Sequence, residues 1–65
     1  MNYRVVWFTG PGINDYEEHT VRLKCTATDA LKRNGFHYST TIGKEDVYHD
    51  NDGNIGSIAP VEEGS

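Results

Sequence analysis

One stretch of this chain alternates apolar with polar residues and two others are rich in β-branched and aromatic residues, and these patterns restrict the fold to a small sheet with two different faces. Residues 2–8, NYRVVWF, and 36–42, FHYSTTI, are rich in residues that favour strands. Residues 19–27, HTVRLKCTA, alternate along their whole length, and one side carries His19, Val21, Leu23, Cys25 and Ala27. Because successive side chains of a strand point to opposite faces, this repeat of two predicts a strand.

A single long helix over residues 15–34 is the alternative for the middle of the chain. Asn14 and Glu17 have the spacing of a capping box, and Gly35 would end such a helix. Its apolar stripe would comprise Tyr16, Leu23, Ala27, Ala30 and Leu31. We favour the strand because the alternation is unbroken and because threonine and valine are mediocre helix formers.

The strand interpretation leaves room for one short helix, DALKRN. Thr28 is then its N-cap, and Gly35 supplies the left-handed residue at its end. Residues 47–50 and 54–59 are further strand candidates. The predicted fold class is α+β, a small antiparallel sheet of three to five strands with one short helix on one face, in the order β-β-α-β-β-β. The runner-up, with the long helix, has the order β-α-β-β-β.

Length and charge limit the architecture and the partners. The 65 residues are expected to form one domain, residues 1–60, and a flexible tail, residues 61–65. The single cysteine excludes an internal disulfide. The net charge of −4 is not that of a duplex-DNA binder, and no apolar run approaches the ~20 residues that cross a bilayer. We therefore expect a cytoplasmic protein that binds neither duplex nucleic acid nor membrane.

The alternation sorts the predicted sheet into a core face and an open face. The core face carries Tyr3, Val5, Trp7, Val21, Leu23, Cys25, Phe36, Tyr38 and Ile42, covered by Ala30 and Leu31. Three of the six basic residues and no acidic residue fall on the open face, where Val6 and Phe8 have no cover. Aromatic and arginine side chains dominate binding hot spots. The predicted partner-binding residues are Arg4, Val6, Phe8, Arg22, Lys24 and His37.

Two loops are candidate sites. Residues 9–15, TGPGIND, lack the lysine of a phosphate-binding loop, so we expect a binding loop displayed by the sheet, with Gly10, Pro11, Gly12 and Ile13 as its candidate residues.

Residues 48–59, YHDNDGNIGSIA, partly match a calcium-binding loop. With Gly53 at the sixth position, Asp50 and Asp52 fall at the third and fifth. The first aspartate and the final bidentate glutamate are absent, because Tyr48 and Ala59 occupy those positions. Asp-Gly between extended segments is a preferred type I′ turn. We therefore predict a hairpin, with no metal and no other cofactor.

The residues suited to catalysis or to transition-metal binding are Cys25, His19, His37 and His49. Nothing in the sequence brings them together. Cys25 falls on the apolar side of its predicted strand, where cysteine is usually a small core residue. We therefore predict no catalytic residue and no enzyme activity.

Residues 20–40, TVRLKCTATDALKRNGFHYST, resemble the strand, A-x-DAL helix, glycine and strand units of small uncharacterised bacterial and phage proteins. The resemblance covers about a third of the chain and carries no catalytic residue. It implies a phage-encoded accessory protein that modulates a host protein by binding.

The expected function is that of a non-enzymatic accessory protein that binds an unknown protein partner or further copies of itself. The alternative is single-stranded nucleic-acid binding through the open face. Phe8 would then stack on bases, and Arg4, Arg22 and Lys24 would contact phosphates. The acidity of the chain favours protein binding.

Overall fold

The computed structural model describes residues 2–61, which form five strands and one helix in the predicted order β-β-α-β-β-β. The strands are β1 (Asn2–Phe8), β2 (Tyr16–Val21), β3 (His37–Ile42), β4 (Glu45–His49) and β5 (Ile55–Val61), and helix α1 spans Lys24–Arg33. Neighbouring strands are antiparallel, in the spatial order β2-β1-β5-β4-β3. The α+β class is confirmed, and the long helix over residues 15–34 is wrong.

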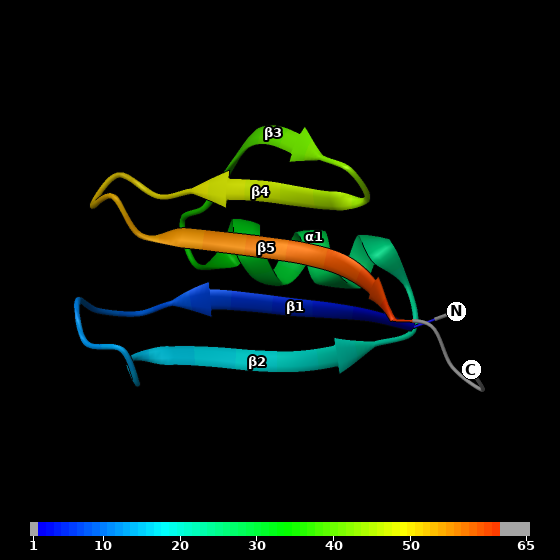
Figure 1. Cartoon of the computed structure of the whole chain (residues 1–65), viewed down its shortest axis with the longest axis horizontal. Helices are drawn as coiled ribbons and strands as arrows, with labels where there is room; N and C mark the ends of the chain where they lie inside the picture. The colour runs from blue at the N-terminus through cyan, green and yellow to red at the C-terminus, as the bar shows by residue number, and fades with distance from the viewer. Residues whose placement is uncertain (1, 62–65) are drawn as a thin grey trace.

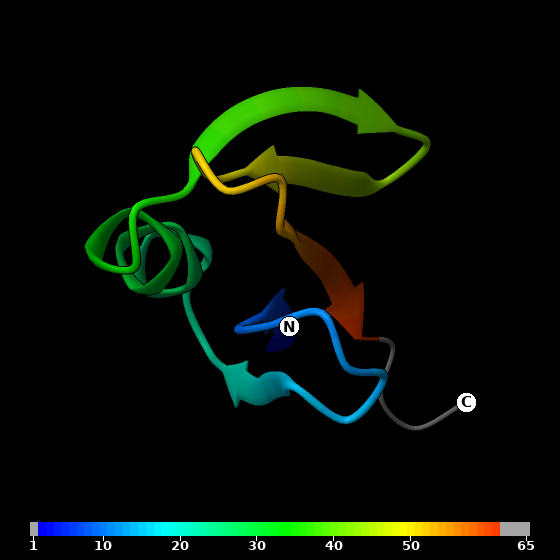
Figure 2. The same ribbon diagram turned by 90° about the vertical axis from the view of Figure 1, so that its left-hand side faces the viewer.

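Helix α1 lies across one face of the sheet, against β1, β5 and β2 (Figure 1). The core between helix and sheet consists of Val5, Trp7, Ala27, Leu31, Phe36, Tyr48 and Ile58. Strand β3 forms the edge furthest along the sheet from β2, and all six of its residues are exposed. The side of the sheet opposite α1 is covered by no element of the described chain (Figure 2).

The chain changes from strand to helix earlier than the alternation predicts. Strand β2 ends at Val21, so the predicted strand over 19–27 is correct only in its first three residues. Leu23, in an extended conformation, is the helix N-cap and makes no side-chain capping bond. Thr28, the predicted N-cap, lies inside the helix, where its hydroxyl donates a 3.1 Å hydrogen bond to the Lys24 carbonyl.

Burial on a helical repeat explains this early start. Ala27 and Leu31 are four residues apart and fully buried, and Ala30 packs beside them. Residues at this spacing share one face of a helix, so a helix that covers the sheet must already have begun before Ala27. The burial of apolar residues at helical spacing therefore decides the structure of this segment, although its local sequence has the period of two that is typical of a strand.

The helix ends as the sequence predicts. Gly35 has a φ of +84°, the left-handed conformation that glycine adopts without strain. Its N–H donates to the Lys32 carbonyl at 3.1 Å, and the Phe36 N–H donates to the Leu31 carbonyl at 3.0 Å. These two bonds form a Schellman motif. Phe36 and Leu31 are both buried in the core, so the same turn ends the helix and places an aromatic ring beneath it.

Four predicted core residues are exposed instead. Leu23 and Cys25 lie at the start of the helical segment, outside its buried stripe. Tyr38 and Ile42 lie on β3, which has little contact with the helix. The predictions for Val5, Trp7 and Phe36 are confirmed. Three core residues lie outside the predicted set, namely Ala27 of α1, Tyr48 of β4 and Ile58 of β5.

Strands β4 and β5 form the predicted hairpin, but its turn is not of type I′. His49 pairs with Ile55, so the loop has five residues, 50–54. Type I′ needs positive φ at both central residues, and within residues 2–61 only glycines have positive φ. Gly53 has a φ of +85°, whereas the φ of Asp52 is negative, so the two residues do not form a type I′ turn.

The last strand extends further than predicted. Val61, assigned to the tail, pairs with Asn2, and Pro60 pairs with Tyr3. Pairing between β4 and β5 ends at Ile58, so Pro60 has a strand neighbour on one side only, a position that tolerates proline. The rest of the predicted tail, residues 62–65, lies outside the described residues.

Candidate functional site: the open face of the sheet

We define the open face as the side of the sheet opposite α1. Arg4, Val6 and Phe8 of β1 point to it, because they alternate with the buried Val5 and Trp7. Residues directly opposite in antiparallel strands share a face, so the register gives the other members. They include Tyr16, Glu18 and Thr20 of β2, Ile55, Ser57 and Ala59 of β5, Glu45, Val47 and His49 of β4, and His37, Thr40 and Ile42 of β3.

An apolar cluster formed by Phe8, Tyr16 and Ile55 occupies one end of the open face. These side chains are 38%, 47% and 48% exposed. The rings of Phe8 and Tyr16 are 6.0 Å apart, within the range of favourable aromatic pairs. The half-buried Val6 continues this surface toward the centre of the face. The cluster is therefore continuous rather than a set of scattered apolar residues.

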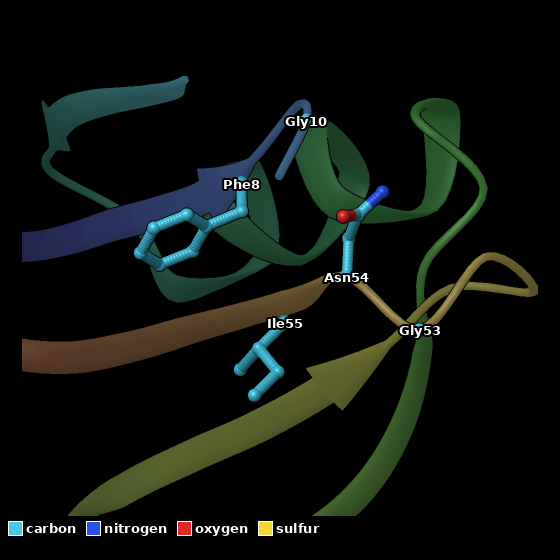
Figure 3. Close-up of a pocket in the computed structure, with 5 residues that line it drawn as sticks. All are labelled: Phe8, Gly10, Gly53, Asn54 and Ile55. Atoms are coloured by element: carbon cyan, nitrogen blue, oxygen red, sulfur yellow. The ribbon is translucent and has the colours of Figure 1, made fainter. Parts of the chain in front are cut away.

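A shallow hollow of about 230 Å³ opens beside this cluster. It is lined by Phe8, Gly10, Gly53, Asn54 and Ile55, from the end of β1 and the β4–β5 loop. Figure 3 shows the side chains of Phe8 and Ile55 side by side, with the Asn54 side chain pointing away from Ile55. The two glycines leave room for an apolar group of moderate size between the strand ends.

The other predicted loop lies at the same end of the molecule. The Gly12 N–H donates to the Asp15 carboxylate at 3.1 Å, and the Thr9 N–H donates to the Asp15 carbonyl at 2.7 Å. These bonds give residues 9–15 a defined shape. Ile13 is 87% exposed in this loop. The loop bends toward the open side of the sheet, away from the helix (Figure 2).

The predicted binding residues divide between two regions of the molecule. Arg4, Val6, Phe8 and His37 lie on the open face. Arg22 and Lys24 do not, because β2 ends before them.

The predicted absence of acidic residues from the open face is also wrong. Glu18 lies opposite Val6, and its carboxylate is 3.8 Å from the Arg4 guanidinium. Both side chains are half exposed, so this ion pair contributes little stability. It forms a polar border beside the apolar cluster.

Lys24 belongs to a polar network on the helix side of the sheet. Its ammonium donates to the Asp46 carboxylate at 2.9 Å. Asp46 also accepts a 2.8 Å hydrogen bond from Thr41, whose hydroxyl is 2.6 Å from that of Tyr38. The hydrogen bond and charge of Asp46 raise the pKa of Lys24. Hydrogen bonds from Lys24 and Thr41 lower the pKa of Asp46. This network ties the start of α1 to β3 and β4.

The acidic β4–β5 loop uses its first carboxylate to hold its own backbone. Asp50 accepts hydrogen bonds from the Asp52 N–H at 2.9 Å, the Asn54 N–H at 2.7 Å and the Asn54 side-chain amide at 2.9 Å. Burial alone would raise the pKa of Asp50, but the bonds from Asn54 and the neighbouring N–H groups together lower it. Both carboxylate oxygens are therefore engaged within the turn.

The structure brings only two of the four residues singled out for catalysis or metal binding together, namely His37 and His49. Cys25 is exposed on α1, which corrects its predicted core position. His19 lies on the helix side, stacked on Trp7 with ring centroids 5.3 Å apart. His37 and His49 are cross-strand neighbours on the open face. Among residues 2–61, no group of three or more His, Cys, Asp or Glu side chains is arranged to hold a metal ion.

Sequence reasoning missed Tyr16, Glu18 and Ile55 as members of this face. The alternation predicts a strand that begins at His19, whereas β2 already begins at Tyr16. The alternation could have revealed the earlier start of β2, because the repeat of two extends toward the N-terminus through Thr20, Glu18 and Tyr16. The pairing of the distant strands β1 and β5, which ends at Trp7 and Gly56, brings Ile55 close to Phe8, and no local pattern reveals this.

Comparison with known protein families, curated proteins and solved structures gave no match. Within the described chain, no helix has the length and apolar character needed to cross a membrane.

Proposed function

We propose that this protein acts by binding another protein through its open face, without catalysing a reaction. The observation that carries the proposal is the apolar cluster of Phe8, Tyr16 and Ile55, which is continuous, substantially exposed and free of cover from α1. Aromatic side chains are enriched among the residues that dominate protein–protein binding energy. The open face presents two aromatic residues, Phe8 and Tyr16, beside Ile55, and such a group is suited to protein binding.

The free energy gained by burying apolar surface supports the cluster as the centre of a binding surface. Each ~100 Å² of apolar surface removed from water contributes about 2.5 kcal/mol. The Arg4–Glu18 pair beside the cluster supplies a polar border of the kind that surrounds the apolar centre of interfaces. The hollow beside Phe8 and Ile55 provides a recess for an apolar side chain of the partner.

Charge favours a protein over single-stranded nucleic acid as the partner. Arg4 is the only Lys or Arg that the strand register of residues 2–61 places on the open face, and it is paired with Glu18. Lys24 is engaged with Asp46 on the other side of the sheet. Nucleic-acid binding depends on several unneutralised cations along one surface.

The test compares three variants as immobilised baits in a lysate of the source organism. Phe8→Ser is expected to reduce the captured protein about tenfold or more, since truncating an aromatic hot spot costs roughly 2 kcal/mol. Its melting temperature should stay within a few degrees of that of the wild type, because Phe8 is outside the core. Trp7→Ser, one residue away, is expected to unfold the domain.

Tyr38→Ser is the matched control, because Tyr38 is also an exposed aromatic residue but lies on the helix side of β3. It is expected to capture as much protein as the wild type. Equal capture by the wild type and Phe8→Ser would refute the proposed function. Folded Trp7→Ser with unfolded Phe8→Ser would mean that the two faces are exchanged.

A further inference from the structure

We infer that the partner of the open face is a second copy of this chain, packed face to face so that two sheets form the inside of a sandwich and the two α1 helices lie outside. This inference rests on the proposed function and names its partner. Three features of the face support it, namely its size, its charge and the small side chains at its centre.

The size of the face matches that of a stable interface. The five strands of the sheet, at about 4.8 Å per strand, and about six residues per strand, at about 3.3 Å each, give a surface of roughly 24 by 20 Å. Its area is roughly 500 Å² in plan, and side-chain relief raises the accessible area toward the ~800 Å² that each partner buries in a standard interface. A short peptide would leave much of this face uncovered.

The charge distribution lowers the electrostatic repulsion that opposes self-association at this face. The chain carries a net charge of −4, so two copies repel each other through most of their surfaces. On the open face, the register places two acidic residues, Glu18 and Glu45, and Arg4 is paired with the first of them. The other six acidic residues in the described chain lie in loops, on the helix or on the helix side of the sheet. They are Asp15, Glu17, Asp29, Asp46, Asp50 and Asp52.

The centre of the face is suited to close sheet packing. Ser57 and Ala59 of β5 and the neighbouring Val6 and Val47 are small or compact and are already half-buried. Two sheets pack about 10 Å apart when their facing side chains interdigitate. The larger side chains of the apolar cluster stand at one end of this centre, where each copy offers a hollow beside Phe8.

The test measures self-association of the purified protein by sedimentation equilibrium. The wild type is expected to form dimers, with the monomer dominant only on dilution. Ile55→Lys is expected to raise the dimer dissociation constant at least about a hundredfold, because each dimer would bury two unpaired lysine charges. Thr40→Lys, a change at an already exposed position on the same face, should weaken the dimer in the same direction and leave the monomer fold unaffected.

Leu23→Lys is the matched control, since it changes an exposed apolar residue to lysine with the same change in net charge, but lies off the face before α1. It should dimerise as well as the wild type. The inference is wrong if the wild type stays monomeric up to about 1 mM, a concentration that populates even weak dimers. It is also wrong if Leu23→Lys weakens the dimer as much as Ile55→Lys.

The same result separates this inference from the proposed function. A monomeric wild type that still captures protein in a Phe8-dependent manner would leave the proposed function standing with a different partner. Loss of both self-association and Phe8-dependent capture would refute both.

Discussion

Gly56 lies in β5 beneath α1, and adding a single methyl group there is expected to destabilise the protein. A Cβ at this position would stand 2.8 Å from Cδ2 of Leu31, 3.3 Å from Cδ2 of Phe36 and 3.3 Å from Cβ of Trp7. Carbon atoms in favourable contact are about 3.5–4.0 Å apart, so an alanine Cβ overlaps Leu31 and makes tight contacts with Phe36 and Trp7. The absence of a side chain at Gly56 therefore allows the helix to approach the sheet closely.

The magnitude follows from two opposing effects. Overpacking a core typically costs about 1–3 kcal/mol. Replacing glycine by alanine also restricts the unfolded chain, which contributes about 0.4–1 kcal/mol of stability where the backbone conformation suits both residues. The difference between these two effects spans about 0–2.6 kcal/mol, and the 2.8 Å approach to Leu31 makes a net loss of about 1–2 kcal/mol the expected result for Gly56→Ala. In a domain of this size it should lower the melting temperature by about 5–15 °C.

Thermal unfolding followed by circular dichroism measures this loss, and a double-mutant cycle assigns its cause. Leu31→Val shortens the side chain that makes the closest approach. The two changes together should cost about 1 kcal/mol less than the sum of the single changes, because the shorter side chain relieves the overlap. Ser57→Ala, the next residue but on the open face, should change stability by less than about 0.5 kcal/mol. An unchanged or higher melting temperature for Gly56→Ala, or strict additivity with Leu31→Val, would refute the reasoning.

Three other predictions concern the helix and the acidic groups. Gly35→Ala should lower the free energy of unfolding by about 1 kcal/mol in urea titrations, because its φ of +84° strains any residue with a Cβ. Cys25, exposed on α1, should react with a thiol reagent at similar rates in the native protein and in denaturant, and Cys25→Ser should leave the melting temperature nearly unchanged. Folding lowers the pKa values of Asp46 and Asp50, so the stability they contribute is present above the ordinary aspartate pKa of about 3.9 and is lost as the pH falls below it. Melting temperatures between about pH 6 and pH 2.5 should therefore fall most steeply below about pH 4, and Asp46→Asn should make that fall shallower.

The sequence predicts the outline of this fold better than its middle segment. Local sequence patterns correctly predict the bounds of β1 and the end of α1 before Gly35. The boundary between β2 and α1 could not be read in this way. HTVRLKCTA satisfies a repeat of two throughout, and the helix begins inside it because Ala27 and Leu31 must both meet the sheet. Cys25 and Leu23, placed in the core by the local pattern, are consequently exposed.

The candidate site was predictable in β1, whose bounds the sequence gives correctly, and at His37 of β3. Alternation in β1 places Arg4, Val6 and Phe8 opposite the core, as the register confirms. The remainder depends on pairings between distant strands. Ile55 and Tyr16 come beside Phe8 through the β5 and β2 registers, and the same β2 register brings Glu18 to Arg4.

Methyl resonances give the most direct test of the claim that two copies of the chain bind each other through the open face. Val6, Val47 and Ile55 carry methyl groups on the open face, whereas Val5 and Ile58 carry theirs in the core. Spectra of methyl-labelled protein recorded from about 20 µM to about 1 mM, a range that spans weak to moderate dissociation constants, monitor both sets in one sample. Concentration-dependent shifts are expected for the first three residues, with the two core residues nearly unaffected. Shifts confined to residues off the open face, such as Leu23, would contradict the account.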